Sequence, residues 1–508
     1  FFALYKLGEE EKASRDYLFL RNRMRVDNEK RAILVIVGYD FELIDDLEEE
    51  IELCLLMSAG KSKVPALLIE SFLDLERIDL AYMVFGKSCI SAQTEGKMIE
   101  LGWRIWNTII DLNLNPEEIG GRCIYNEPMY TDVEVIRSII NIVKRPKFED
   151  GKRKKRGSKI AVQSHTLGIG GAERQASYLL SLLAKGKIKS EDFVFITNLK
   201  PNASLRKSTY YPKIDPLDLE IIEYGKPSKE GFFVVDSRFL DKIKHLSPTK
   251  RRRTERLFEI YGENDFDIAH LWQDWCNVNG GIAALASGVE KIILSARTLP
   301  PPKKGLLSKR SGRSYLECYQ LLLGCEGVIL THNSEYGSSE YAKWIGISEE
   351  SFDVVNNGVS VDELALDVDE VGVGIRESLG ISEKSLIIGT IGRFTQEKRP
   401  WTFLKVAEQI LAANGASDVP FSLELNEWYV ENEGENSFTT DSLESLTAQL
   451  KGVKKEVNFV ILGDGMMFER ASRIVNKSNI LSDNVHLVGF SNDVPAFLME
   501  FDVFLLTS

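Results

Sequence analysis

Two cations follow an apolar run in the segment LIIGTIGRFTQEKRP, which covers residues 386–400. The run closes at Gly392, and Arg393 and Lys398 come soon after it. A guanidinium group can bind phosphate oxygens in pairs, and an ammonium group acts on them as a point charge. A phosphorylated ligand would therefore suit this segment. The alternative is that both cations are simply solvated at the surface.

A glycine-rich segment, SHTLGIGG at residues 164–171, is the second candidate for chemistry. Gly170 and Gly171 would let the backbone approach a ligand, and the helix expected at 172–184 would offer free N–H groups at its first turn. A phosphate or a sugar hydroxyl would fit there. Glu173 stands where a dinucleotide-binding sequence has its third glycine, which argues against a dinucleotide site. The alternative is a glycine turn with no ligand.

Both segments lie between an apolar run and an amphipathic stretch, which is the pattern of strand, loop and helix. Loops of this kind lie at the carboxyl ends of the strands in a doubly wound sheet, where ligands bind. We expect strands at residues 159–163, 193–197, 231–235, 266–272, 291–295, 327–331, 354–359, 386–391, 458–462, 485–488 and 502–506. Their alternation with helical patterns predicts an α/β chain with two tandem Rossmann-like parallel sheets.

The patterns divide the chain into four parts. We expect a helical N-terminal region at 1–146, a basic linker at 147–158, one α/β domain at 159–350 and a second at 351–508. The helical region would be either a partner-binding module or an appendage packed on the main body. Within it, residues 32–37 could form a strand or a buried helical turn. Residues 417–456 interrupt the second domain and are expected to form a surface insertion.

Composition excludes several classes of protein. The 508 residues are 44% hydrophobic and 27% charged, as in ordinary globular domains. A net charge of −13 argues against general nucleic-acid binding. The six cysteines contain no CxxC pair, which argues against a zinc site and fits buried thiols in a reducing compartment. No apolar run approaches the ~18 residues that span a bilayer, and no signal peptide is visible.

Two basic runs stand out at residues 152–156 and 250–253. Such runs are usually solvated. The sharper interpretation is attraction to anionic lipid head groups, worth about 1 kcal/mol per cation near the surface. The sequence is therefore expected to belong to a cytoplasmic protein, with possible peripheral contact at the inner face of the plasma membrane.

Seven segments, taken in order and spacing, resemble the glycosyltransferases of family 4, especially bacterial capsule and exopolysaccharide enzymes. They are GGAERQ at 170–175, FDIAH at 266–270, NS at 333–334, VVNNGVS at 354–360, IGRFTQEKRP at 391–400, FVILGDG at 459–465 and VHLVGFSNDVPAFLMEFDVFLLTS at 485–508. The resemblance covers residues from about 159 to 508 and implies the GT-B fold. It also implies a retaining transfer of a sugar from a nucleotide-sugar, expected to be UDP-linked, to a saccharide or lipid-linked acceptor in surface polysaccharide biosynthesis. It implies no cofactor and no essential metal.

The resemblance assigns roles to particular residues of the second domain. In that family the basic loop holds the donor diphosphate, which would be the role of Gly392, Arg393 and Lys398. The backbone around Gly489 and Phe490 would flank the nucleobase.

In the first domain the resemblance is less complete. Gly170 and Gly171 would lie near the diphosphate and the acceptor. The family usually has a histidine where this chain has Arg297, so Arg297 and the nearby His270 are the candidates for its catalytic role. The alternatives are that His270 is a structural histidine at a strand end and that Arg297 pairs with an acidic neighbour.

The family's paired glutamates would follow Ser508, and so would its crossing C-terminal helix. We therefore expect a fragment with an incomplete second domain, whose own activity is open. Two other functions stay open from the sequence. One is a non-catalytic scaffold of a polysaccharide assembly complex, whose region 1–146 would dock a protein partner. The other is a GT-B-shaped nucleotide-sugar epimerase.

Overall fold

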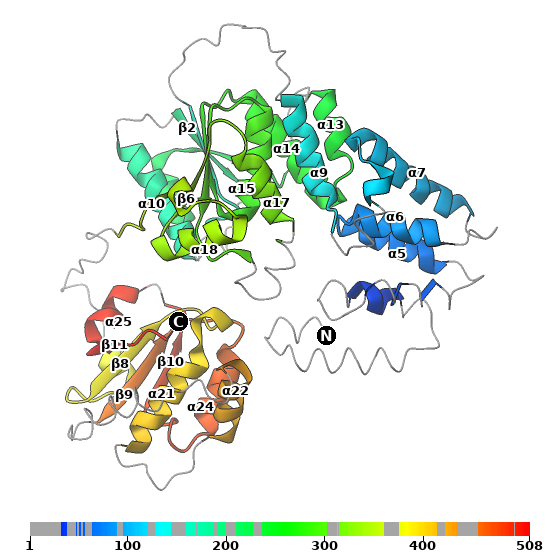
Figure 1. Ribbon diagram of the computed structural model, residues 1–508. Helices are drawn as coiled ribbons and strands as arrows, with labels where there is room; N and C mark the ends of the chain where they lie inside the picture. Colours follow the sequence, from blue (N-terminus) through cyan, green and yellow to red (C-terminus); the bar gives the residue numbers. More distant parts are fainter. Residues whose placement is uncertain are drawn as a thin grey trace. The chain divides into compact units, whose positions relative to one another are not determined.

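The computed structural model describes residues 32–37, 47, 50–51, 54–55, 63–88, 95–119, 128–143, 159–168, 170–186, 192–198, 210–226, 236–301, 312, 314–359, 375–413, 422–433, 456–491 and 493–507. The expected linker at 147–158 and the expected strand at 231–235 lie outside these residues. The described chain divides into two compact units, one ending at Gly358 and the other beginning at Val359. Each is described by itself (Figure 1).

The N-terminal region is helical wherever it is described, as expected. It contains α5 (Lys63–Asp74), α6 (Ile78–Lys87), α7 (Glu95–Leu112) and α9 (Thr131–Val143). Residues 32–37 are helical too, so they form a helical turn and not a strand. Helices α5, α6 and α7 enclose an apolar core of their own. None of the helices in the described part of the chain is both long and apolar enough to cross a bilayer.

The larger unit also holds a seven-stranded sheet in the order β3-β2-β1-β4-β5-β6-β7. All of its neighbouring strands are parallel. The strands are β1 (Ile160–Gln163), β2 (Phe193–Thr197), β3 (Glu220–Glu223), β4 (Ile268–Trp272), β5 (Lys291–Ala296), β6 (Val328–His332) and β7 (Phe352–Val354). This is the Rossmann-like order that the sequence predicted, and its switch point lies between β1 and β4.

Two strands of this sheet differ from the expectation. The sequence analysis missed β3, because this edge strand has the sequence EIIE and too few apolar residues to stand out. The segment predicted to open the second domain instead completes the first sheet. Here β7 pairs with β6, Phe352 is buried in the core of that sheet, and the N–H of Val355 donates to the carbonyl of His332 at 2.8 Å.

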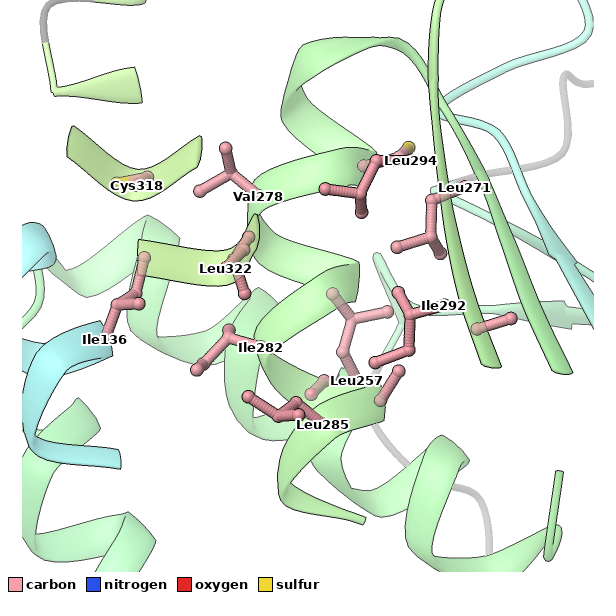
Figure 2. Close-up of a cluster of buried hydrophobic side chains, with 14 of the residues drawn as sticks. Ile136, Leu257, Leu271, Val278, Ile282, Leu285, Ile292, Leu294, Cys318 and Leu322 are labelled. Atoms are coloured by element: carbon pink, nitrogen blue, oxygen red, sulfur yellow. The ribbon is translucent and has the colours of Figure 1, made fainter. Parts of the chain in front are cut away.

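Helices cover both faces of the first sheet. On one face α10 (Gly171–Lys185) and the short α12 (Tyr211–Ile214) pack against β1 and β2. On the other face lies a larger core built by α9, α13 (Ser237–Ile243), α14 (Pro248–Glu263), α15 (Gln273–Ala286), α17 (Tyr315–Leu323) and α18 (Glu335–Ile345). Figure 2 shows Ile136 of α9 beside Val278 and Ile282 of α15. Thus α9 belongs to the core of this sheet, although it precedes the expected linker.

The smaller unit has a four-stranded parallel sheet in the order β10-β9-β8-β11. Its strands are β8 (Leu386–Ile391), β9 (Val457–Leu462), β10 (Val485–Gly489) and β11 (Val503–Phe504), and its helices are α20 (Ile375–Leu379), α21 (Pro400–Ala413), α22 (Leu423–Glu433), α24 (Phe468–Lys477) and α25 (Val494–Glu500). The expectation of two Rossmann-like sheets preceded by a helical region is therefore confirmed.

The expected surface insertion is wrong in one part. Helix α22 falls inside residues 417–456, and its Leu425 and Trp428 are buried in the core of the smaller unit. The Trp428 ring lies 5.5 Å from the ring of Trp401 on α21. The acidic residues in the middle of residues 417–456 led the sequence analysis to overlook the apolar residues of α22, which mark a packed helix.

Candidate functional site

The basic loop of the smaller unit lies at the switch point of its sheet. Strand β8 is flanked by β9 on one side and by β11 on the other, so the loops that leave β8 and β11 diverge there. A pocket opens at this point. It is lined by Thr390, Ile391, Gly392, Arg393, Phe394, Lys398, Pro400, Phe403, Ile461, Leu506 and Thr507. The structure thus brings the three residues predicted to hold a diphosphate into the wall of one pocket.

Local backbone geometry sets the positions of Arg393 and Lys398. A 3₁₀ turn at Gln396–Lys398 follows the strand, and Arg399 adopts the left-handed conformation with φ 45° before α21 begins. The hydroxyl of Thr507, which follows β11, donates to the carbonyl of Lys398 at 3.4 Å. The side chain of Arg393 is exposed and lies 3.7 Å from the carboxylate of Glu397. An exposed pair of this kind is weak, so the guanidinium can turn to an anion.

Gly463 lets the ends of β8 and β9 pack together beside the pocket. A Cβ on Gly463, whose φ is 141°, would lie 1.9 Å from the carbonyl oxygen of Gly392. The N–H of Gly463 donates to the carbonyl of Gly489 at 2.8 Å, and the N–H of Gly392 donates to that of Leu462 at 3.0 Å. Gly463 is therefore required for the shape of the site. The sequence analysis used Gly463 only as part of the FVILGDG segment that carries the resemblance.

Gly489 and Phe490 lie at the end of β10, two strands away from β8 in the sheet. Phe490 is largely exposed. Neither residue lines the pocket that holds Arg393 and Lys398. Their role beside a nucleobase stays a prediction.

In the larger unit, Gly170 and Gly171 begin α10, as expected. Gly170 is the N-cap residue, and a Cβ there would lie 2.2 Å from a carboxylate oxygen of Glu173. The other oxygen of Glu173 lies 3.3 Å from the amide nitrogen of Gln273, the first residue of α15. The glycine at 170 thus makes room for a carboxylate that links the helices after β1 and β4.

The sequence analysis placed His270 at a strand end, and this is wrong. His270 is inside β4, where it pairs with Val162 of β1 and Ile293 of β5. Burial, reinforced by the nearby charge of Arg297, lowers its pKa to about 4. The imidazole is therefore neutral at neutral pH. Its ring lies 5.2 Å from that of Trp272, so the structure gives it a packed environment rather than an open one.

Arg297 is the first residue after β5, and its guanidinium is stacked 4.2 Å over the ring of Trp272. Its Nη2 donates to Oδ1 of Asn357 at 2.7 Å. Burial lowers its pKa to about 10, so it remains a cation at neutral pH. Its Nε has no hydrogen-bond partner within the part of the chain that the structure describes. Arg297 and His270 thus both lie against Trp272, and only Arg297 carries charge to the edge of the sheet.

The sequence analysis missed Gln175, the last residue of the GGAERQ motif. Its amide nitrogen donates to the carbonyl of Gly358 at 2.7 Å, and the N–H of Gly358 donates back to its Oε1 at 2.9 Å. Gln175 is buried on α10, so it ties the helix after β1 to the backbone that follows β7. An amide residue at the end of a glycine motif was the available signal.

A second missed group lies after β1 itself. Nδ1 of His165 is 2.6 Å from the hydroxyl of Tyr224, and the Tyr224 ring stacks on Trp275 with centroids 5.1 Å apart. The guanidinium of Arg253 lies 5.8 Å from the Trp275 ring. Burial and Arg253 lower the pKa of His165. This group puts a neutral imidazole and a cation near the switch point of the first sheet.

The basic run at 250–253, which contains Arg253, does not form one patch. Arg252 is exposed, whereas Lys250 is half-buried and paired with the carboxylate of Asp132. These cations therefore face different surroundings. The run at 152–156 lies outside the described residues.

The chain is similar in sequence to a polysaccharide biosynthesis protein and to a galactosyltransferase. It is 26% identical over 363 residues to the Vi polysaccharide biosynthesis protein VipC/TviE of Salmonella typhi, a match that covers 69% of this chain and 55% of that protein. It is 22% identical over 289 residues to the UDP-Gal:alpha-D-GlcNAc-diphosphoundecaprenol alpha-1,3-galactosyltransferase of Escherichia coli, which covers 57% of this chain and 62% of that protein. The expected resemblance to polysaccharide glycosyltransferases is thereby confirmed. In these matches the chain spans less than two thirds of either relative's length.

No protein-family model matches the chain. Solved structures that align with it include a glycosyltransferase from Rickettsia africae, at a TM-score of 0.41 and 14% identity over 70% of this chain and 74% of that one. WaaG, a glycosyltransferase involved in lipopolysaccharide biosynthesis, aligns at a TM-score of 0.37 and 14% identity over 69% and 75%. Similarities at this level add nothing to the strand order described above.

Proposed function

We propose that this chain is a glycosyltransferase that moves a sugar, with retention, from a nucleotide-sugar donor to a saccharide or lipid-linked acceptor in surface polysaccharide biosynthesis. The observation that carries the proposal is the pocket at the β8–β11 switch point, whose wall contains Gly392, Arg393 and Lys398. Sequence similarity to two proteins of polysaccharide biosynthesis supports the same class of reaction.

In the proposed reaction the bond between the anomeric carbon and the diphosphate oxygen breaks, and a bond forms to the acceptor oxygen. The acceptor hydroxyl gives up its proton, and the departing nucleoside diphosphate takes the negative charge. Arg393 and Lys398 would stabilise that charge as it develops, because preformed cations act strongly on a leaving group. Gly392, in the pocket wall, would let the diphosphate approach the backbone, and Gly463 would keep the end of β9 packed against the carbonyl of Gly392.

The acceptor side of the proposal rests on the larger unit. Arg297 would offer a fixed cation to an acceptor, and Gly170 and Gly171 would leave the first turn of α10 accessible. His270, being half-buried and neutral, would support Trp272 and Arg297 rather than carry charge. The catalytic role expected of His270 is thereby reduced to positioning in this proposal.

The donor is proposed to carry UDP, and the reaction is proposed to need no cofactor or metal. The E. coli relative is named for a UDP-galactose donor and a diphosphoundecaprenol-linked acceptor, which supports a UDP-sugar and a lipid-linked acceptor here. An acceptor of that kind would place the protein in the cytoplasm, peripheral to the inner face of the plasma membrane. A protein partner on the helical region belongs to the same proposal.

A thermal-shift panel tests the proposed donor. UDP, GDP and ADP would each be added to the chain, with NAD as the comparison. Ligands that bind the folded state raise the melting temperature in proportion to the logarithm of concentration over Kd. We expect UDP to stabilise the chain most. Stabilisation by NAD but by none of the diphosphates would contradict the proposal, and binding is read without any need for turnover.

A further inference from the structure

One face of α7 carries four large apolar side chains that the core of its own unit does not bury. Ile99 is 47% exposed, Trp103 64%, Trp106 42% and Ile110 67%. They are separated by four, three and four residues, so they form one stripe along the helix. A different face of α7 fills the core of the helical region with residues such as Leu101 and Ile105. Helix α7 is therefore apolar on two faces.

The size of this stripe needs an explanation. A tryptophan buries up to about 250 Å² when it is covered, so the exposed parts of Trp103 and Trp106 amount to roughly that area. With the two isoleucines the stripe offers roughly 400 Å², about the largest patch that a monomer usually exposes. Two such stripes would bury roughly 800 Å², and the surrounding rim would bring the total toward the ~1,000 Å² of a specific interface.

The sequence of the stripe identifies its occupant. From Ile99 to Ile110 it has the form I-x₃-W-x₂-W-x₃-I, which is the same in both directions. If a second copy of α7 lay antiparallel to the first, a two-fold axis would pass between positions 104 and 105. Ile99 would then meet Ile110 of the second copy, and Trp103 would meet Trp106 of the second copy. A two-fold interface requires this kind of self-complementary surface.

Charges beside the stripe argue against an anionic lipid surface as the occupant. Glu100 and Asp111 border it on the helical wheel. The cations of α7 are engaged elsewhere, because Lys97 lies 2.7 Å from the carboxylate of Glu70 and Arg104 lies 3.6 Å from that of Asp74. Asp111 is already paired with Lys244 at 2.9 Å, so it adds little repulsion between two copies. Glu100 lies at the solvated rim, where its carboxylate is 3.5 Å from the ammonium of Lys97.

We propose that the chain forms a symmetric dimer in which the Ile99–Trp103–Trp106–Ile110 stripe of α7 packs antiparallel against the same stripe of a second copy. The two tryptophans are the centre of the contact, as aromatic anchors commonly are. The dimer is independent of the proposed glycosyl transfer, because none of its residues lines either candidate site.

The test is the mass of the full chain in solution over a range of concentrations, by sedimentation equilibrium. The wild-type chain is expected at twice its monomer mass at tens of micromolar. Trp103→Glu and Ile110→Glu should each raise the dimer dissociation constant at least tenfold, because each buries a carboxylate against an apolar side chain of the second copy. Leu182→Glu is the matched control, since Leu182 is equally exposed but lies on α10. Circular dichroism checks each fold, and Ile110→Ser replaces any variant that unfolds.

The register is tested by cross-linking with a short thiol reagent. Ile99→Cys mixed with Ile110→Cys should link, whereas Ile99→Cys alone should not exceed the background of the wild-type chain. The proposal is overturned if the wild-type chain is monomeric at tens of micromolar, or if both glutamate variants remain dimers. It is also overturned if Ile99→Cys links only to itself, which would mean a parallel pair. A monomer whose tryptophan fluorescence shifts on anionic vesicles would assign the stripe to a membrane instead.

Discussion

Gln175 holds the backbone of Gly358 with both ends of its side-chain amide, at 2.7 Å and 2.9 Å. The two residues are separated by nearly the whole of the first α/β domain. The contact fixes the segment that leaves β7 against the helix that leaves β1. It thereby sets where Asn357, the partner of Arg297, lies.

Replacing Gln175 with alanine should leave a backbone donor and acceptor of Gly358 without partners. A hydrogen bond contributes about 0.5–1.5 kcal/mol net, so losing both should lower the free energy of unfolding of Gln175→Ala by about 1–3 kcal/mol. Urea denaturation followed by fluorescence measures it. Arg174→Ala, at the exposed neighbouring position, is the control. Equal stability of the wild-type chain and Gln175→Ala would show that the contact contributes nothing.

Arg297 should not be replaceable by lysine. Its planar guanidinium stacks on Trp272 and donates to Asn357 at once, whereas an ammonium would be a compact point charge. Arg297→Lys should therefore destabilise the chain by about 0.5–2 kcal/mol, the range of a partly buried cation–π contact. Arg252→Lys, at an exposed position, serves as the control. If both variants melt at the same temperature, the stacking has no energetic value.

His270 should make stability fall on acidification. Its pKa in the folded state is about 4, below the usual 6.5 of the unfolded state, so the unfolded chain binds the proton first. Its contribution to stability is complete above pH 6.5 and is lost as the pH falls toward 4, by up to about 3 kcal/mol. His270→Gln should flatten the pH dependence of the unfolding free energy in that window. The same slope in both chains would refute a buried neutral imidazole.

Glu76 should make stability fall as the pH rises, in contrast to His270. It is buried in the turn between α5 and α6, accepts from the N–H of Ser247 at 2.9 Å, and has a pKa raised to about 7. Burial is the main cause, with Asp132 adding to it and Lys250 opposing it. The unfolded chain ionises first, so stability is lost as the pH rises from about 4.5 to 7. Glu76→Gln should remove this loss, and Glu70→Gln, on the exposed side of α5, should not.

Gly463→Ala should distort the pocket at the β8–β11 switch point. The cause would be steric overlap, in addition to the cost of placing alanine at a positive φ. The new Cβ would lie 1.9 Å from the carbonyl oxygen of Gly392, which cannot move without displacing the end of β8. We expect a loss of at least about 3 kcal/mol, combining overpacking and a positive φ. Gly489→Ala is the matched contrast. Gly489 also has a positive φ, of 80°, but a Cβ added there would have no neighbouring atom within 4 Å. It should lose only about 1–2 kcal/mol. Calorimetry of the two variants separates these costs.

The sequence predicted the elements that are strongly apolar and end in glycine or a cation. β8 and the loop to Lys398 are of this kind, because a buried parallel strand and a polar loop contrast sharply. It could not predict which sheet β7 joins, since Phe352–Val354 is short and its pairing with β6 is set by distant residues. Gln175 carried only the weak signal of an amide at the end of a glycine motif, because its partner Gly358 lies far along the chain. Trp428 was obscured by acidic neighbours.

The most direct test of the account is a calorimetric titration of UDP into three chains, namely the wild type, Arg393→Ala and Arg399→Ala. Arg393 lines the pocket at the β8–β11 switch point, whereas Arg399 lies in the same loop but is not part of the wall. The account predicts that Arg393→Ala weakens binding at least tenfold and that Arg399→Ala leaves it within about twofold of the wild type. Equal affinities for the wild type and Arg393→Ala, or no binding of UDP, GDP or ADP to the folded wild-type chain, would contradict the assignment of this pocket to the donor diphosphate.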